Sequence, residues 1–360
     1  MKKSFFIGVV AIALISSTAI SAAQDESADQ TKMVLVKNIT GRISPKSVLS
    51  NQNGLVSAHN MMYNHTVTVY DAVTFDLLHT IPDSVRLSDC GYSQYSGLYR
   101  GAPVEGAFSP DGNYLYFTNY AMYGKGFTKE GHDVCSPASG YDSSFLSRVD
   151  LATLEIDAVY PVGAVPKVVQ VTPDNKYILV SNWCGYTVTV ISVAKQKVVR
   201  TIKLGRYPRG IAVSEDSSKA YVAEMGGTNL HVIDLMDFSQ TLIPIGSNPR
   251  AVVLSPDGTR VYATLNAAGK VIAWDLIKKK PIKTVATGKA ARSLAISTDG
   301  TALFVVNFFG STISKVRTSD MKVIQTIKTC KEPIGITYDG PMDRTWVACY
   351  DGSIKVFDNN

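Results

Sequence analysis

Motifs for catalysis and metal binding are scarce in this chain. It contains no G-x-S-x-G nucleophile elbow, no phosphate-binding P-loop and no H-E-x-x-H pattern. His79, His132 and His231 are scattered without ligand spacing. These absences argue against serine hydrolases of the elbow type, P-loop nucleotide hydrolases and H-E-x-x-H zinc proteases. No cofactor is expected.

Long apolar segments are also few. The run from Phe5 to Ile15 follows Lys2 and Lys3 and precedes the small residues Ser21-Ala22-Ala23, a pattern typical of an export signal over residues 1–23. The run is far shorter than the roughly 20 residues that a membrane-spanning helix needs. We therefore expect a periplasmic or secreted protein without a membrane span.

Strong charge of one sign is absent as well. The net charge of +6 falls to +4 without Lys2 and Lys3, which is too mild to identify a partner. Residues 24–31 are polar, and we expect them to form a disordered lead-in. The remaining residues, 32–360, are expected to form a single domain, because all-β rings often reach this length.

One structural unit recurs along the chain and is marked by short polar turns. Four of these turns begin at Thr172, Ser214, Ser255 and Ser297, which are 42, 41 and 42 residues apart, and Asp339 follows 42 residues later. Such a period indicates propeller blades or solenoid coils. Each of these turns, and the one that begins at Ser109, carries an aspartate at its third position. We expect the aspartates to stabilise the turns, and they are Asp111, Asp174, Asp216, Asp257 and Asp299.

Each unit divides into four short strands. In the unit from Pro208 to Asn248, four runs rich in β-branched and aromatic residues alternate with turns, as in a propeller blade. The last unit has only three strands, and residues 33–41 have the composition of the missing fourth. We therefore predict an all-β fold: a seven-bladed β-propeller of four-stranded antiparallel blades, closed by an N-terminal strand that pairs in the last blade. The units start near Lys46, Pro103, Pro166, Pro208, Pro249, Ala291 and Pro333.

Several segments resemble a known repeat family. The segments Tyr177–Asn182, Tyr221–Ala223 and Phe304–Asn307 look like its YVTN core, and the Ser-Pro-Asp-Gly turns match its other landmarks. The chain thus resembles the YVTN-repeat (YncE-like) β-propellers over nearly all of its mature length. The resemblance implies an exported seven-bladed propeller, usually a binding protein, with nucleic-acid binding proposed for some members. It implies no single activity.

Four of the five cysteines occupy paired positions in the repeat. Cys90 and Cys135 lie in blade two, while Cys330 and Cys349 lie at equivalent places in blade seven. Exported proteins meet oxidising conditions, so we predict the disulfides Cys90–Cys135 and Cys330–Cys349. Cys184 is expected to be a partly buried free thiol. The alternatives are a bond to Cys135 or a metal or redox role.

A basic residue recurs five positions before the turn in most blades. The five basic residues at this position are Lys46, Lys167, Arg209, Arg250 and Arg292. Equivalent positions lie on a circle in a closed ring, so these charges should surround the channel entrance on the face that carries the long loops. One interpretation pairs them with nearby acids. The other is an anion site, with Arg206, Tyr207 and Trp183 adding a further charge and stacking surfaces.

Two functions follow from these features. The first is an exported non-enzymatic binding protein that holds an anionic ligand, such as nucleic acid or another polyanion, or a protein partner. The alternative is a propeller enzyme of lactonase-like or lyase-like type with a metal at the channel mouth. His59 and His65, which lie near Met61 and Met62, are weak candidates for metal ligands, and solvated histidines are the simpler interpretation.

Overall fold

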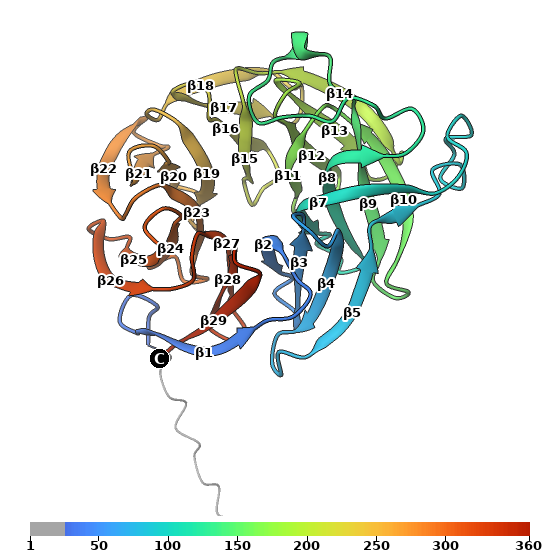
Figure 1. The fold of residues 1–360 in the computed structure, drawn as a ribbon. Helices are drawn as coiled ribbons and strands as arrows, with labels where there is room; N and C mark the ends of the chain where they lie inside the picture. The colour runs from blue at the N-terminus through green and yellow to red at the C-terminus, as the bar shows by residue number, and fades with distance from the viewer. Residues whose placement is uncertain (1–25) are drawn as a thin grey trace, which may run out of the picture.

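Seven antiparallel β-sheets surround one central axis. The computed structural model describes residues 26–360, so the expected export signal lies outside the described residues. In Figure 1 the sheets stand as blades, each with its first strand innermost. No α-helix occurs in the described part of the chain, and therefore none that could cross a membrane. The predicted all-β seven-bladed propeller is confirmed.

The strands follow the chain from blade to blade. Blade 1 contains β2 (Pro45–Ser50), β3 (Leu55–Asn60), β4 (Thr66–Asp71) and β5 (Leu77–Pro82). Blade 2 contains β7 (Tyr99–Phe108), β8 (Tyr114–Tyr123), β9 (Ser144–Asp150) and β10 (Glu155–Val162), with the short β6 (Ser84–Val85) paired to β7. Blade 3 contains β11 (Pro166–Val171), β12 (Tyr177–Asn182), β13 (Thr187–Ser192) and β14 (Lys197–Lys203).

The later blades repeat this plan. Blade 4 contains β15 (Pro208–Val213), β16 (Lys219–Glu224), β17 (Asn229–Asp234) and β18 (Gln240–Pro244). Blade 5 contains β19 (Pro249–Leu254), β20 (Arg260–Leu265), β21 (Lys270–Asp275) and β22 (Lys280–Ala286). Blade 6 contains β23 (Ala291–Ile296), β24 (Ala302–Asn307), β25 (Thr312–Arg317) and β26 (Lys322–Lys328). Blade 7 contains β27 (Pro333–Asp339), β28 (Arg344–Cys349), β29 (Ser353–Asn359) and β1 (Met33–Ile39).

The N-terminal strand closes the ring. β1 pairs antiparallel with β29 in a register that runs from Met33 opposite Asn359 to Ile39 opposite Ile354. The register shifts once, between Leu35 and Lys37. Because β29 gains a partner, the last blade has four strands like the others, and the predicted closure is confirmed.

The segment before β1 differs from the expected disordered lead-in. The backbone N–H of Ala28 donates to Asp299 Oδ2 at 2.8 Å, and that of Asp29 donates to Thr301 Oγ1 at 3.1 Å. The Lys315 ammonium donates to the carbonyl oxygen of Thr31 at 2.8 Å. Residues 26–31 therefore pack on blade 6, because blade 6 offers hydrogen-bond partners that composition alone does not reveal.

The core lies between neighbouring blades. All six residues of β24 are buried, whereas the outermost strand β22 is almost entirely exposed. One apolar cluster joins blade 2 to blade 3 through Tyr116, Val169 and Ile178, and similar clusters join the other blades. The inner strands are thus fixed from both sides, which makes them a rigid frame for side chains at the axis.

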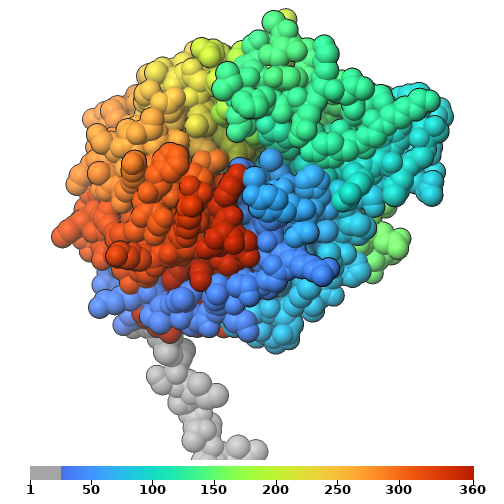
Figure 2. All heavy atoms as spheres, in the orientation of Figure 1, coloured from blue at the N-terminus to red at the C-terminus, as the bar shows by residue number. Residues whose placement is uncertain are grey.

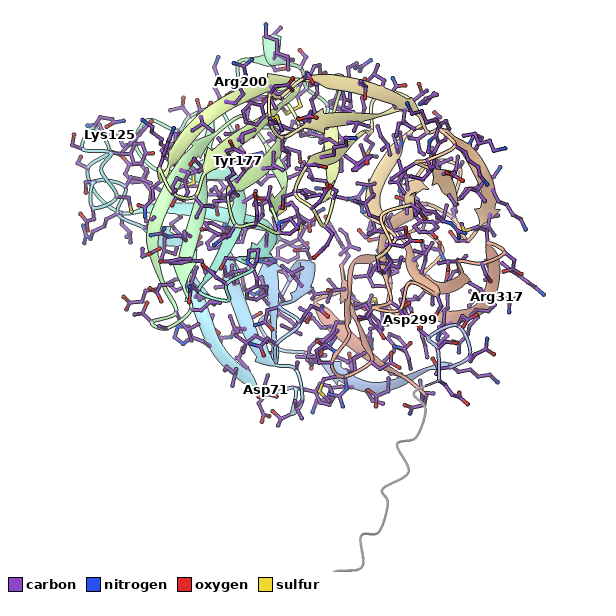
Figure 3. The ribbon with its side chains drawn as sticks, turned by 180° about the vertical axis from the view of Figure 1, so that it is seen from behind. Asp71, Lys125, Tyr177, Arg200, Asp299 and Arg317 are labelled. Atoms are coloured by element: carbon purple, nitrogen blue, oxygen red, sulfur yellow. A yellow bond between two sulfur atoms is a disulfide. The ribbon has the colours of Figure 1, made fainter. Side chains whose placement is uncertain are left out.

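The short turns occupy the face opposite the long loops. In the turn before β12, Thr172 Oγ1 donates to Asp174 Oδ1 at 2.6 Å, and the backbone N–H of Lys176 donates to the same oxygen at 3.0 Å. The structural role expected for the repeated aspartates is confirmed there. Figure 3, turned by 180° from Figure 1, shows the molecule from the side of these turns, with Asp299 labelled. The opposite face carries the β8–β9 insertion, the raised green segment of Figure 2.

Candidate functional site

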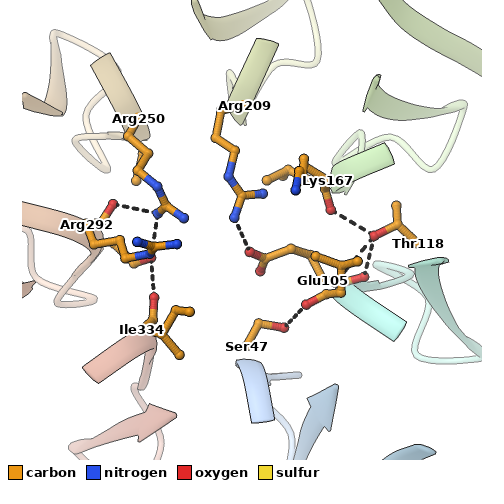
Figure 4. Close-up of polar contacts among 12 residues, drawn as sticks. Ser47, Glu105, Thr118, Lys167, Arg209, Arg250, Arg292 and Ile334 are labelled. Atoms are coloured by element: carbon orange, nitrogen blue, oxygen red, sulfur yellow. Dashed lines mark hydrogen bonds and ion pairs between the residues drawn. The ribbon is translucent and has the colours of Figure 1, made fainter. Parts of the chain in front are cut away.

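Five basic side chains meet around the central channel. Each is the second residue of an innermost strand: Lys46 on β2, Lys167 on β11, Arg209 on β15, Arg250 on β19 and Arg292 on β23. Figure 4 shows the last four converging with Glu105. We call these five residues the cation ring. Arg209, Arg250 and Glu105 line a cavity of about 130 Å³ in the channel.

Hydroxyl groups from adjacent blades fix the backbone of the ring. Thr118 Oγ1 donates to the carbonyl oxygen of Lys167 at 2.8 Å, and Ser181 Oγ donates to that of Arg209 at 2.8 Å. Thr264 Oγ1 donates to that of Arg292 at 3.2 Å. Each hydroxyl lies on the second strand of one blade and reaches the first strand of the next. These inter-blade hydroxyl bonds therefore fix the positions of three of the five ring residues.

Carboxylates neutralise only part of the ring. Arg209 Nη2 lies 3.1 Å from Glu105 Oε1, and Lys167 Nζ lies 2.9 Å from Asp133 Oδ1. Among the described residues, Lys46, Arg250 and Arg292 have no carboxylate within ion-pair distance. Five cations and two paired anions leave an excess of three positive charges in a largely buried site.

The pKa values of the ring reflect this excess. Burial lowers the pKa of Lys167 to about 8, although Asp133 acts in the opposite direction. Burial and the charge of Arg209 lower the pKa of Arg292 to about 10. Burial and the charge of Arg292 lower the pKa of Lys46 well below its ordinary value. Buried like charges repel, so the site favours the entry of an anion.

Two buried guanidinium nitrogens lack a hydrogen-bond partner, namely Arg209 Nη1 and Arg292 Nε. The Arg250 side chain forms hydrogen bonds through Nη1 alone, which donates to the carbonyl oxygen of Arg292 at 3.0 Å and to Ser293 Oγ at 3.5 Å. Unpaired buried donors are rare in folded proteins, since each forfeits a hydrogen bond to water. An anion bound in the channel would supply the hydrogen-bond acceptors that Arg209 Nη1 and Arg292 Nε lack.

Aromatic side chains cover several of the cations. The Lys167 ammonium lies 4.3 Å from the Tyr120 ring centroid, and the Arg292 guanidinium lies 4.2 Å from that of Phe308. The Lys46 ammonium lies 5.5 Å from the Tyr350 ring. Rings at these distances attract the cations through their negative faces, but they carry no net charge, so the excess of positive charge remains.

Trp183 and Tyr207 bind the insertion instead of forming open stacking surfaces. Their rings stack on each other with centroids 4.4 Å apart. Trp183 Nε1 donates to the carbonyl oxygen of Asp133 at 2.9 Å, and the Tyr207 hydroxyl accepts from the backbone N–H of Cys135 at 3.3 Å. Arg206 is exposed beside Tyr207. The pair therefore positions the Asp133 carboxylate against the ring.

The prediction of a Cys90–Cys135 disulfide is wrong. Cys135 bonds to Cys184, the partner considered as an alternative, and Cys90 is free. The prediction assumed that the insertion stays within its own blade. The insertion instead crosses to blade 3, where Tyr186 Oη donates to the carbonyl oxygen of Cys135 at 2.8 Å.

The second predicted disulfide, Cys330–Cys349, is confirmed. The two half-cystines lie at the start of blade 7 and at the end of β28. Two disulfides are typical of proteins from oxidising compartments.

The two histidines proposed as weak metal ligands have separate environments. His59 is fully buried, its Nδ1 lies 2.9 Å from Ser47 Oγ, and burial lowers its pKa to about 3. His65 lies 3.6 Å from Asp83 and stacks on Tyr123. In the described part of the chain, no cluster of three or more potential ligands includes either histidine. The structure therefore does not assemble the proposed metal site.

Comparisons with known proteins agree with the fold. Residues 138–219 match the family described as YNCE-like beta-propeller. Antigen Lp49 of Leptospira interrogans is 27% identical over 167 residues, which covers 43% of this chain and 36% of Lp49, so this chain matches only about a third of that relative. The hydrazine synthase structure of Kuenenia stuttgartiensis superposes with a TM-score of 0.67 at 16% identity, covering 88% of this chain and 96% of that one. At that identity, the likeness concerns the fold alone.

Proposed function

Because the chain is a seven-bladed β-propeller similar to the YncE-like family, we propose that it is an exported binding protein whose central channel holds a compact anion. The observation that carries this proposal is the cation ring, in which three of five buried or partly buried cations lack a carboxylate. The two disulfides, the apolar run after Lys2 and Lys3, and the name of the relative, an antigen, support export.

The dimensions of the site favour a small anionic group over an extended polyanion. The side chains of Lys167 and Arg209 are only 7% and 6% exposed, so a nucleic-acid backbone lying on the surface would reach little of their charge. The cavity that Arg209 and Arg250 line has a volume of about 130 Å³. A phosphate, sulfate or carboxylate group is of that scale, and guanidinium groups bind all three.

Arg250 is the best position at which to test the site. It has no ion-pair partner, so Arg250→Gln leaves no carboxylate stranded, whereas a change at Arg209 would strand Glu105. A hydrogen bond to a charged group contributes about 1.5–3 kcal/mol, so we expect phosphate affinity to fall roughly 10- to 150-fold. Isothermal titration with phosphate, sulfate, acetate and a single-stranded oligonucleotide would measure it.

The exposed Arg206 supplies the control. We expect Arg206→Gln to leave phosphate binding unchanged, because this side chain lies outside the buried ring. If Arg206→Gln weakened binding and Arg250→Gln did not, or if the oligonucleotide bound more tightly than phosphate with a steep salt dependence, a surface polyanion site would replace the channel site.

A second candidate is a protein partner on the loop-bearing face. Three large side chains in loops of this face are strongly exposed, namely Tyr63, Val134 and Phe309, at 82%, 76% and 62%. Exposed aromatic and apolar side chains are common at interfaces. A pull-down in which Phe309→Ser and Val134→Ser abolish a partner captured by the wild-type chain, with phosphate binding intact, would support this second function.

A further inference from the structure

One carboxylate lies inside the channel cavity among its cations. Among the described residues that line the cavity, the polar side chains are those of Ser47, Glu105, Arg209, Arg250 and Ser293. Glu105 is the only acid of this set, and its side chain is 23% exposed. The cavity therefore presents a negatively charged hydrogen-bond acceptor as well as guanidinium donors.

The hydroxyl groups of the cavity already have partners in the protein. Ser47 Oγ donates to the carbonyl oxygen of Val104 at 2.9 Å, and Ser293 Oγ donates to that of Ile334 at 2.8 Å. The Glu105 carboxylate, in contrast, accepts one hydrogen bond from the described residues, which runs from Arg209 Nη2 to Oε1. An ionised carboxylate has about four acceptor sites, so Glu105 retains most of its capacity for a ligand.

A single guanidinium joins this carboxylate to an unpaired donor. Arg209 Nη2 lies 3.1 Å from Glu105 Oε1 (Figure 4), while Arg209 Nη1 is buried and has no hydrogen-bond partner among the described residues. Both nitrogens are bonded to the same carbon atom, so an anion that accepts from Nη1 places an oxygen near the Glu105 carboxylate. Two ionised oxygens repel each other there, whereas a hydroxyl hydrogen on the anion would turn the contact into a charge-assisted hydrogen bond.

We propose that Glu105 makes the channel selective for a small oxyanion that carries a hydroxyl hydrogen, such as hydrogen phosphate, over a fully ionised oxyanion such as sulfate. Phosphate and sulfate share a tetrahedral shape, but near neutral pH phosphate retains at least one hydrogen and sulfate retains none. The hydroxyl of hydrogen phosphate donates to the Glu105 carboxylate, and its other oxygens accept from Arg209 and Arg250. The inference rests on the proposed anion site and names the class of ligand that this site takes.

A comparison of two anions on the wild-type chain tests the preference. Isothermal titration with phosphate and sulfate is carried out at pH about 7, which lies below the pKa of Lys167, about 8, so that this lysine is protonated. We expect phosphate to bind roughly 10- to 150-fold more tightly than sulfate, which is the range that one hydrogen bond to a charged group provides.

Phenyl phosphate distinguishes free phosphate from a phosphorylated compound. The second pKa of a phosphate monoester is about 6, so at pH about 7 most of the ester has no hydroxyl hydrogen. We expect phenyl phosphate to bind no more tightly than sulfate. If it bound as tightly as phosphate, recognition of a hydroxyl hydrogen would be refuted.

Two variants that remove one negative charge each assign the preference to Glu105. Glu105→Gln keeps an amide oxygen that can accept from Arg209 Nη2, and we expect the preference for phosphate to fall to near equality, mainly through tighter sulfate binding. Asp133→Asn is the matched control, because the Asp133 side chain is 72% exposed and does not line the cavity. Both affinities should rise together in this variant, and their ratio should stay unchanged.

The outcomes separate this inference from the proposed function. If neither anion bound the wild-type chain, the anion site would fail and the inference with it. If phosphate and sulfate bound the wild-type chain equally well, the anion site would stand and the role of Glu105 would be refuted. The same loss of preference in Asp133→Asn as in Glu105→Gln would also refute it, because the effect would then follow net charge alone. The wild-type comparison holds even where Glu105→Gln fails to fold.

Discussion

Breaking the Cys135–Cys184 disulfide should destabilise the protein far more than removing Cys90. The bond joins residues 49 apart in sequence. In the loop-entropy treatment, closing a loop of that length stabilises the fold by about 4 kcal/mol, compared with about 3 kcal/mol for the 19-residue separation of Cys330–Cys349. Cys90 forms no bond and is partly exposed, so Cys90→Ala should change the free energy of unfolding by less than about 1 kcal/mol.

Urea denaturation under non-reducing conditions measures these differences. Cys135→Ser, Cys184→Ser and the double variant each remove the same bond, so all three should lose about the same stability, near 4 kcal/mol. Thiol titration of the unfolded wild-type chain should find Cys90 alone free. A Cys90→Ala variant as unstable as Cys135→Ser, or losses that add in the double variant, would refute the cross-blade bond.

Three further predictions concern the closure and the ring. Removing residues 1–39 deletes β1 and leaves β29 with a free edge, so we expect a loss of several kcal/mol, at roughly 0.5–1.5 kcal/mol per ladder bond, and self-association visible in light scattering. Phosphate affinity should fall as the pH rises through about 8, because Lys167 then loses its proton, and Lys167→Arg should flatten this profile between pH about 7 and 9. At a pH well below the pKa of Lys167, Asp133→Asn should raise phosphate affinity about 1.4- to 5-fold in titration calorimetry, since it frees a protonated Lys167 from a partner whose ion pair contributes about 0.2–1 kcal/mol; a lowered affinity at that pH would contradict the role given to that carboxylate.

The pH dependence of stability has a definite sign at Lys167. Its pKa in the folded chain, about 8, lies below the ordinary value of 10.5, so the unfolded chain binds more protons between these values. Folding is therefore penalised below pH 8, and the penalty is relieved as the pH rises from about 8 to 10.5. Asp133 acts with the same sign at low pH, because its pKa is also lowered on folding. Desolvation would raise its pKa, but Lys167 brings it to about 2, so its contribution is lost as the pH falls from about 4 towards 2.

The blades and the cation ring could be predicted because both depend on the repeat. Equivalent turns fix equivalent strands, so the period of 42 residues places Arg209, Arg250 and Arg292 at one radius without further information. The closing strand was also predictable, since the last unit had three strands and residues 33–41 matched the fourth.

The features that the sequence analysis missed lie in the part of the chain that breaks the repeat. The β8–β9 insertion has no counterpart in other blades, so no period indicated that it would cross to blade 3 and bond to Cys184. The ion pair of Asp133 with Lys167 was missed for the same reason. One signal in the sequence was available. Trp183 is adjacent to Cys184 and Asp133 is two residues from Cys135, so a Cys135–Cys184 disulfide would place Asp133 close to Trp183, as the structure shows.

The inter-blade hydroxyl bonds hold Lys167, Arg209 and Arg292 by their backbone carbonyls and do not involve the side chains of these residues. Scaffold and ligand preference are therefore separable in this molecule. Lys46 or Arg292, whose side chains make no hydrogen bond or ion pair between blades among the described residues, could be exchanged for neutral or acidic residues while the circumference of the channel stays unchanged. The propeller would then be a rigid scaffold whose ligand-binding side chains can be replaced. A few acidic substitutions could change its preference from anions to cations.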